Sequence, residues 1–221
     1  MAEYALTATS TEAPAGTFYD RIAGFYDWTF KLNGYGRSLD QYFRDHPVPV
    51  FPDAKILDAG CGTGLLTFAL LRALEVPVSI TAIDLSGSSI AKGKKAMAKG
   101  DSGNHKVSFM QGNVLSLPFA DASFDFVVTS GVLEYVPLAE GFSELARVVA
   151  PGGHLLNLPI RPTFAGMLLQ LMFRLKIHPP SEIAEHTRRH FRVVNDYRFP
   201  PLQLIGWTKT AVLAQKLDSS E

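Results

Sequence analysis

The chain has 221 residues, of which 47% are apolar, and this length and composition suit one large domain. Its 21 basic and 21 acidic side chains give a formal net charge of zero, which disfavours a nucleic-acid-binding protein with a strongly basic surface. Cys61 is the single cysteine and cannot form an internal disulfide; with no secretory signal and no apolar run of about 18 residues, a cytoplasmic protein is expected.

The N-terminal region divides into a tail and a helical cover. Residues 1–17 are rich in Ala, Thr, Ser and Pro without periodicity, which predicts a flexible tail. Residues 18–32 place aromatic and aliphatic side chains at helical spacing, which predicts an amphipathic helix ending at Asn33-Gly34. A second short helix is expected over 37–44. We therefore expect residues 18–46 to form a helical cover at the start of a domain that spans 18–221.

From residue 55 onward, apolar strands alternate with helices. The expected strands are 55–59, 78–83, 106–110, 124–130 and 154–158, and the expected helices are 64–74, 87–99 and 138–149. This alternation predicts an α/β three-layer sandwich with a parallel sheet and right-handed crossovers. Residues 191–199 and 207–215 indicate two further strands, with a turn at Pro200-Pro201 and no room for a crossover helix between them. They are expected to pair antiparallel.

A glycine-rich turn follows the first of these strands in the sequence ILDAGCGTG, residues 56–64. Glycine at 60, 62 and 64 permits a tight turn and close approach of a ligand, and the next helix contributes its N-terminal N–H groups and dipole. A dinucleotide fingerprint needs Gly or Ala at the sixth position of G-x-G-x-x-G, where this chain has Leu65. The spacing therefore disfavours a nicotinamide cofactor.

Asp84 stands at the end of the second strand, roughly 20 residues after the glycine turn. An acidic side chain there can accept hydrogen bonds from both hydroxyls of a ribose. The alternative is that Asp84 caps the following helix, although Ser86 could serve as that cap. The sequence leaves both interpretations open and favours ribose contact.

These residues resemble the glycine motif and acidic residue of class I S-adenosylmethionine-dependent methyltransferases. Residues 112–136 (GNVLSLPFADASFDFVVTSGVLEYV) are similar to the middle signature of that family, and residues 144–159 (ELARVVAPGGHLLNLP) to its later helix, glycine turn and fifth strand. The resemblance covers about residues 18–216, and FYDRIAGFYD resembles the cofactor-closing helix of the quinone and phospholipid methyltransferases. It implies a Rossmann-like, seven-stranded, mostly parallel sheet with one antiparallel strand near the C-terminus, and S-adenosyl-L-methionine as cofactor.

The resemblance also implies a cofactor site in which the glycines flank the methionine portion and Asp84 holds the ribose. The residues assigned to it are Tyr19, Asp58, Gly60, Cys61, Gly62, Thr63, Gly64, Asp84, Leu85, Asn113, Val114 and Ser130. Tyr19 and Tyr26 stand at the aromatic positions of the cofactor-closing helix, and core packing is the alternative role for both. Cys61 is expected to fill space within the glycine motif. Two departures stand out: Asn113 replaces the usual Asp beside the adenine, and Glu134-Tyr135 stand where the family often has His.

The sequence names the cofactor better than the catalytic base, because methyl transfer mainly requires holding a nucleophile in line with an activated methyl group. His186, His190 and Tyr19 are the candidates for proton removal, and a loop is expected around the two histidines. No His/Cys cluster has metal-ligand spacing, so no metal is expected.

The segment 161–189 is expected to form a lid over the carboxyl ends of the strands, where open α/β sheets bind substrates. It combines the apolar run FAGMLLQLMF with a group of basic side chains. This pattern predicts a small-molecule acceptor that is hydrophobic or lipid-like, reached with peripheral membrane contact; an ordinary lid helix packed on the core is the alternative. Two other functions stay open, a non-catalytic S-adenosylmethionine-binding protein and a nicotinamide-dependent oxidoreductase.

Overall fold

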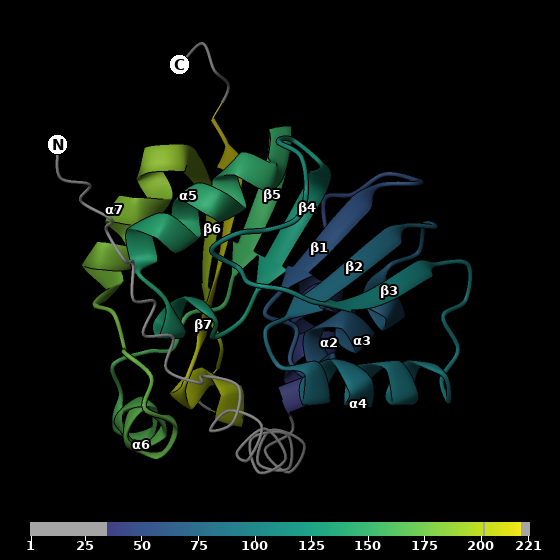
Figure 1. Cartoon of the computed structure of the whole chain (residues 1–221). Coiled ribbons are helices and arrows are strands. Elements are labelled where there is room, and N and C mark those ends of the chain that lie inside the picture. Colours follow the sequence, from purple (N-terminus) through teal and green to yellow (C-terminus); the bar gives the residue numbers. More distant parts are fainter. Residues whose placement is uncertain (1–34, 201, 218–221) are drawn as a thin grey trace, which may run out of the picture.

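The computed structural model describes residues 35–200 and 202–217, and in this part of the chain it contains a seven-stranded sheet in the order β3-β2-β1-β4-β5-β7-β6. Helices cover both faces of the sheet, as Figure 1 shows. The expected tail, the expected helix over 18–32, and Tyr19 and Tyr26 lie outside the described residues.

Six strands of the sheet run parallel and one runs against them. The strands are β1 (Lys55–Ala59), β2 (Ser79–Asp84), β3 (Lys106–Gln111), β4 (Phe124–Thr129), β5 (Val149–Asn157), β6 (Phe191–Arg198) and β7 (Thr210–Lys216). Strand β7 pairs antiparallel with both β5 and β6, whereas all other pairings are parallel. The predicted Rossmann-like sheet with one antiparallel strand near the C-terminus is therefore confirmed.

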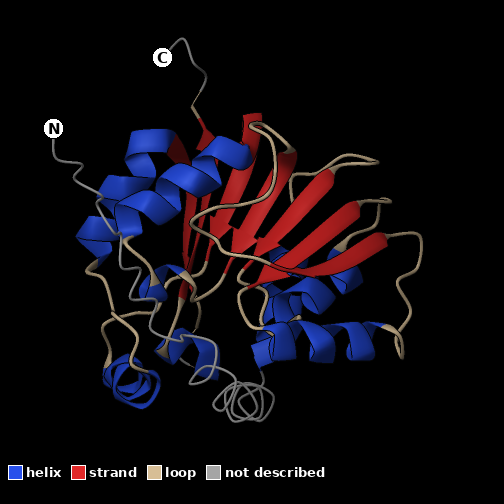
Figure 2. Cartoon of the chain, in the orientation of Figure 1, coloured by secondary structure: helices blue, strands red, loops and turns tan. Residues whose placement is uncertain are grey.

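Two helical layers enclose the sheet, as Figure 2 shows. One layer consists of α2 (Tyr35–Asp45), α3 (Leu65–Ala73) and α4 (Gly87–Met97), and the other of α5 (Leu138–Val148) and α7 (Pro180–His190). The central strands are apolar along their length because both of their faces are covered. Ile56 contacts the first layer and its neighbour Leu57 the second, since successive side chains of a strand point to opposite faces.

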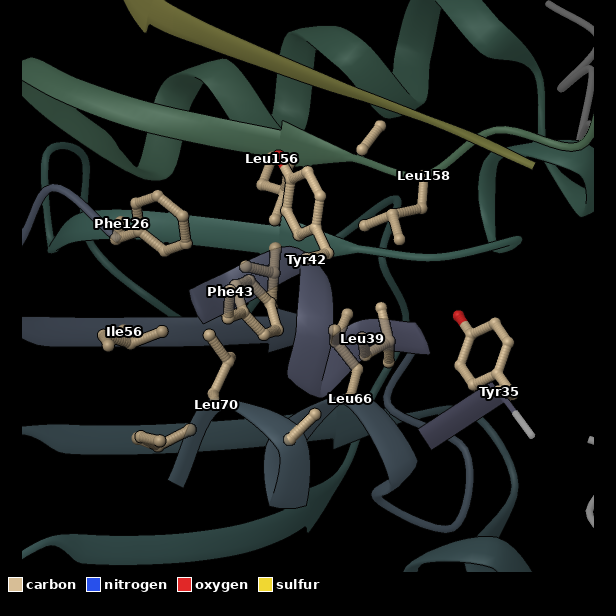
Figure 3. Packing of buried hydrophobic residues seen from close by; sticks show 14 of the residues in the cluster. Tyr35, Leu39, Tyr42, Phe43, Ile56, Leu66, Leu70, Phe126, Leu156 and Leu158 are labelled. Carbon is tan, nitrogen blue, oxygen red and sulfur yellow. The ribbon is translucent and has the colours of Figure 1, made fainter. Parts of the chain in front are cut away.

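Helix α2 is held by an aromatic cluster. Figure 3 shows Tyr42 and Phe43 among side chains of the sheet, including Phe126 and Leu156, and of α3. The Tyr42 and Phe43 rings lie edge to face, with centroids 5.4 Å apart. This packing fixes the start of α2 near the carboxyl ends of β1 and β4, where the candidate site lies.

The segment 161–189, expected to form a lid, is mostly helical. It contains α6 (Phe164–Phe173) and most of α7, with Pro180 in the first turn of α7 where its missing N–H is harmless. His186 and His190 therefore lie in a helix, and the loop expected around them was wrong. The last predicted strand also begins later, at Thr210, because Trp207 belongs to the 3-10 helix η2 (Leu204–Trp207).

Helix α6 does not pack its apolar face on the core. Its buried residues are Gly166 and Phe173, and Phe173 packs with Ile160 and Leu175 in a small separate cluster. Phe164 and Leu171 are 87% and 80% exposed, and Met167 and Leu168 are exposed as well. The alternative of an ordinary lid helix with its apolar face on the core is therefore wrong for most of α6.

Candidate functional site

The glycine loop between β1 and α3 adopts a backbone that requires glycine. Gly60, Gly62 and Gly64 have φ values of 76°, 54° and 93°, all in the left-handed region. A Cβ on Gly60 would also lie 2.5 Å from Cβ of Val132, whereas a Cβ on Gly62 would meet open space. Gly60 therefore combines a backbone requirement with close packing, and Gly62 has the backbone requirement alone.

The N–H groups of this loop donate within the protein. Gly60 and Cys61 both donate to the carbonyl oxygen of Ile83, at 2.8 and 3.0 Å, and Gly64 donates to Cys61 at 2.9 Å. Gly62 donates to Oδ2 of Asp84 at 2.8 Å. A pyrophosphate cradle instead points several backbone N–H groups at its ligand. Four N–H groups of the loop are therefore already bonded within the protein and are not free to bind a pyrophosphate.

Asp84 joins the glycine loop to the turn that begins α4. It is 7% exposed, and its two carboxylate oxygens accept hydrogen bonds from the backbone N–H groups of Gly62 and of Ser86, each at 2.8 Å. Ser86 is the helix cap, because its Oγ accepts from the N–H of Ser89. A carboxylate offers about four acceptor positions, so these two bonds do not exhaust its capacity for ligand hydroxyls.

A cavity of about 260 Å³ opens beside Asp84 at the carboxyl ends of the strands. Six of the predicted cofactor residues line it: Gly60, Asp84, Leu85, Asn113, Val114 and Ser130. Its walls are mostly apolar with a few polar groups, and its volume lies just under the ~300 Å³ at which typical small-molecule pockets begin. The arrangement fits a nucleoside, with apolar walls for the base and a carboxylate for the ribose.

Asn113 contributes less directly than the sequence suggests. Its side-chain Oδ1 accepts from the N–H of Leu115 at 3.0 Å and thereby closes a local turn. The amide oxygen has a second lone pair and the amide nitrogen is a donor, so contact with a base still fits the geometry.

Asp58 lies beneath the loop and does not line this cavity. It is 1% exposed, and Oγ1 of Thr67 donates to its Oδ2 at 2.5 Å, while Oδ1 has no hydrogen-bond partner in the part of the chain that the structure describes. Burial raises the pKa of Asp58 to about 7, against the lowering effect of the Thr67 hydrogen bond, and the charge of Asp84 raises it further. Asp58 therefore supports the glycine loop from beneath and has no direct contact with this cavity.

The other predicted loop residues do not line this cavity either. Cys61 packs with Ala82, Ile90 and Phe109, and burial raises the pKa of its thiol, so the structure supports the filler role. Gly62, Thr63 and Gly64 shape the loop behind Gly60.

Residues far apart in the sequence complete the site. The hydroxyl groups of Tyr35, at the start of α2, and Ser130, after β4, are 2.7 Å apart, and burial raises the pKa of Tyr35. Tyr135, Phe173 and Arg174 also line the cavity, the last two at the end of α6. The cofactor residues predicted from the sequence did not include these four. Tyr135 stood out there only as a departure from the family's usual His, and Phe173 and Arg174 only as part of the expected lid.

Glu134 and Lys209 are buried beside the site and hold its wall. Oε1 of Glu134 accepts from the N–H of Ile160 at 2.6 Å, and Nζ of Lys209 donates to the carbonyl oxygen of Leu158 at 3.1 Å. Burial lowers the pKa of Lys209 to about 8, opposed by the charge of Glu134. At the position where the family often has His, this chain thus places one residue that anchors the wall, Glu134, and one that lines the cavity, Tyr135.

The predicted bases His186 and His190 lie away from the cavity. The His186 ring stacks on Phe142 of α5, with centroids 6.2 Å apart. His190 ends α7 where Leu217 donates to its carbonyl oxygen, near the amino-terminal edge of the sheet, and burial lowers its pKa. Their role as bases stays a prediction that this placement does not favour. Within residues 35–200 and 202–217, no group of three His, Cys, Asp or Glu could hold a metal ion.

Comparison with known proteins connects this geometry to methyltransferases. A family model described as a methyltransferase domain matches residues 56–153. The chain is 31% identical over 144 residues to the ubiquinone/menaquinone biosynthesis C-methyltransferase UbiE of Geotalea daltonii, covering 63% of this chain and 60% of that protein. It is 32% identical over 153 residues to the demethylmenaquinone methyltransferase of Desulfitobacterium hafniense, covering 67% of this chain and 59% of that protein. The chain thus spans about three fifths of both relatives.

A solved structure shares the fold. The geranyl diphosphate C-methyltransferase of Streptomyces coelicolor A3(2), in complex with Mg²⁺, geranyl-S-thiolodiphosphate and S-adenosyl-L-homocysteine, superposes with a TM-score of 0.69. The match covers 82% of this chain and 76% of that one at 18% identity.

Proposed function

Because the chain belongs to the class I S-adenosylmethionine-dependent methyltransferase family, we propose that it transfers a methyl group from S-adenosylmethionine to a small hydrophobic acceptor. The observation that carries this proposal is the apolar cavity bordered by Asp84, joined to a glycine loop in which four N–H groups bond within the protein. The named relatives are methyltransferases, two of them acting in quinone biosynthesis by name, and this supports the same reaction class here.

The described residues suggest how the cofactor is held. Asp84 accepts from the ribose hydroxyls, Leu85 and Val114 contact the adenine, and Asn113 bonds its edge. Gly60 lets the backbone approach the methionine portion, and the charge of Asp58, buried behind the loop, attracts its ammonium group. Thr63, Gly62, Gly64 and Cys61 keep the loop in this shape, and Ser130 is positioned by Tyr35.

The reaction needs little beyond binding and positioning. S-adenosylmethionine supplies a methyl group that is already activated on a sulfonium centre. The apolar walls of the cavity exclude water, which favours a step in which positive charge is lost. Tyr135, which lines the cavity, is suited to orient the acceptor, and no residue is assigned as its base.

The exposed face of α6 supports a hydrophobic or lipid-like acceptor. Phe164, Met167, Leu168 and Leu171 lie at helical spacing on a helix whose C-terminal end, Phe173-Arg174, lines the cofactor cavity. No helix in the described ranges is long and apolar enough to cross a membrane. We propose that α6 makes peripheral contact with a membrane or with the acceptor itself, as the mobile part of the cover.

Calorimetric titration with S-adenosylmethionine, S-adenosylhomocysteine, NAD⁺ and NADH tests the cofactor assignment. The first two are expected to bind at micromolar levels, and tighter binding of either dinucleotide would overturn the proposal. Methyl transfer from radiolabelled S-adenosylmethionine to a panel of quinols, phenols and prenyl compounds then tests turnover. Cofactor binding without transfer to any of them would favour the non-catalytic alternative.

A further inference from the structure

A second cavity lies at the other side of the α6 segment. It has a volume of about 270 Å³ and is enclosed by α7, by the residues that follow β5, and by the facing ends of β6 and β7. It shares no lining residue with the cofactor cavity. One face of α7 forms its wall, because Pro180, Ile183, Ala184, Thr187 and Arg188 recur at helical spacing along that face.

Positively charged side chains outnumber negatively charged ones around this cavity. Arg161, Arg188 and Arg198 contribute three positive charges, and Asp196 contributes the single negative charge among the lining residues. Nη1 of Arg161 donates to the carbonyl oxygen of Gly206 at 2.6 Å. In contrast, the side chains of Arg188 and Arg198 make no hydrogen bond or ion pair within the described part of the chain.

Most other arginines in the described part of the chain bond to another residue. Arg37, Arg188 and Arg198 do not, and of these three only Arg188 and Arg198 line this cavity. Arg189, next to Arg188 on α7, pairs with Glu185, and Arg147 bonds to both Glu144 and Asp121. Arg72 pairs with Asp40. Unpaired guanidinium groups around one cavity match the geometry of carboxylate and phosphate ligands, which accept their N–H groups in pairs.

His178 provides an independent observation inside the same cavity. Its side chain is 3% exposed and lines the cavity, and its Nε2 is buried without a hydrogen-bond partner among the described residues. Nδ1 lies 3.0 Å from Oε2 of Glu182, which holds the ring and accepts the Nδ1 proton. A buried polar atom without a partner is unfavourable, so its retention points to a ligand atom at Nε2. Because Nδ1 donates to Glu182, Nε2 donates to an oxyanion when the ring is doubly protonated and accepts from a ligand O–H when it is not.

An apolar groove adjoins the cavity and shares Arg161, Thr163 and Arg198 with it. From these residues the groove continues along Phe164 of α6, Phe199 and Trp207. A ligand held by the cations through its anionic end would therefore meet apolar side chains on its other part.

We infer that this second cavity binds the oxyanion head, phosphate or carboxylate, of an amphipathic molecule whose apolar part lies in the adjoining groove. The inference deepens the proposed function, since such a molecule is the acceptor itself or a lipid that holds the protein where the acceptor resides. Arg188, Arg198 and His178 bind the oxyanion, and Asp196 limits the affinity for it. The head group is recognised at a site separate from the cofactor cavity.

Nuclear magnetic resonance of the full ¹⁵N-labelled chain, titrated with inorganic phosphate at constant ionic strength, tests the site directly. The ring resonances of His178 are expected to shift, and Arg188→Gln and Arg198→Gln should each weaken binding roughly tenfold. Asp196→Asn should strengthen it. Arg189→Gln is the matched control, because it removes one charge from the same helix outside the cavity. Equal effects of Arg188→Gln and Arg189→Gln would overturn the inference.

Two further measurements separate the sources of the oxyanion. Decyl phosphate below its micelle concentration should bind more tightly than inorganic phosphate, and flotation with vesicles containing phosphatidylglycerol, compared with pure phosphatidylcholine, detects a lipid head group. Binding to either probe that Arg198→Gln weakens supports the site. An absence of His178 shifts together with vesicle binding insensitive to Arg188→Gln and Arg198→Gln refutes it.

Titration of S-adenosylhomocysteine against the same variants keeps the two proposals apart. Its affinity should be unchanged, because none of these arginines lines the cofactor cavity. Failure of the wild type to bind S-adenosylhomocysteine would refute the proposed function and leave the oxyanion site to the phosphate titration.

Discussion

Replacing Asp84 by alanine removes two kinds of interaction at once, and the two can be measured separately. In the free protein, the carboxylate accepts from the N–H groups of Gly62 and Ser86, both at 2.8 Å, at a position only 7% exposed. Hydrogen bonds to charged groups contribute about 1.5–3 kcal/mol each, so we expect Asp84→Ala, which removes two, to lower the free energy of unfolding by roughly 3–6 kcal/mol. Urea denaturation without ligand measures this loss.

The same substitution should weaken S-adenosylhomocysteine binding by roughly 2–4 kcal/mol, about 30- to 1,000-fold, through the lost ribose contacts. A 2′-deoxy analogue separates direct contact from loop distortion: wild type should discriminate against it, and Asp84→Ala should not. Asp101→Ala is the matched control, since Asp101 accepts one backbone N–H, that of Gly103, in an exposed turn. Equal discrimination by wild type and Asp84→Ala would refute ribose contact, and an unchanged unfolding curve would refute the bridging role.

Three further predictions follow from the geometry. Gly60→Ala should destabilise the protein by roughly 1–3 kcal/mol more than Gly62→Ala. A Cβ at position 60 would lie 2.5 Å from the Val132 side chain, whereas a Cβ at position 62 would meet open space. Thermal unfolding of both variants measures the difference. The folded-state pKa of Asp58 is raised to about 7, so the folded protein holds a proton that the unfolded chain has lost, and stability should fall by about 2 kcal/mol between pH 5 and pH 7. Urea unfolding of Asp58→Asn should lack that fall, and an identical pH dependence would contradict the assigned cause. Leu171→Asp should change the free energy of unfolding by less than about 0.5 kcal/mol yet reduce binding to phosphatidylglycerol vesicles, because Leu171 is exposed. Leu169 packs against the Phe173 cluster, so Leu169→Asp should unfold at a lower temperature. Early unfolding of Leu171→Asp would show that its face of α6 is covered.

The sequence of α6 does not show which of its faces is exposed. The run Phe164–Phe173 is apolar on nearly every position, so its periodicity distinguishes no inner from outer face. The structure leaves Phe164 and Leu171 exposed and turns Phe173 inward. The hydrophobic-acceptor hypothesis thus survives with a different geometry: α6 presents its side chains outward and contributes only its end to the cofactor cavity.

The sequence by itself determined the alternation of strands and helices, the antiparallel pairing of the last two strands and the position of the glycine loop, whereas the single antiparallel strand of a seven-stranded sheet was implied by the family resemblance. These depend on spacing within short windows, such as three glycines in five residues after a buried strand, and local spacing is preserved whatever the rest of the chain does. It also brought Asp84 to the correct edge, because the carboxyl ends of adjacent parallel strands must meet there. The prediction of a loop around His186 was wrong. This segment has few apolar and many charged residues, so its apolar periodicity is too weak to distinguish a helix from a loop.

Only the tertiary structure decided which distant residues share a site. Tyr35 and Ser130 are 95 positions apart, and their hydroxyl groups meet because α2 packs across the sheet. Arg188 of α7 and Arg198 of β6 line one cavity with His178, although each alone resembles an ordinary surface or loop residue in the sequence. Contacts of this kind depend on how helices and strands pack in three dimensions, and no spacing along the chain encodes them; that packing turns unremarkable side chains into a cofactor wall and a cluster of cations.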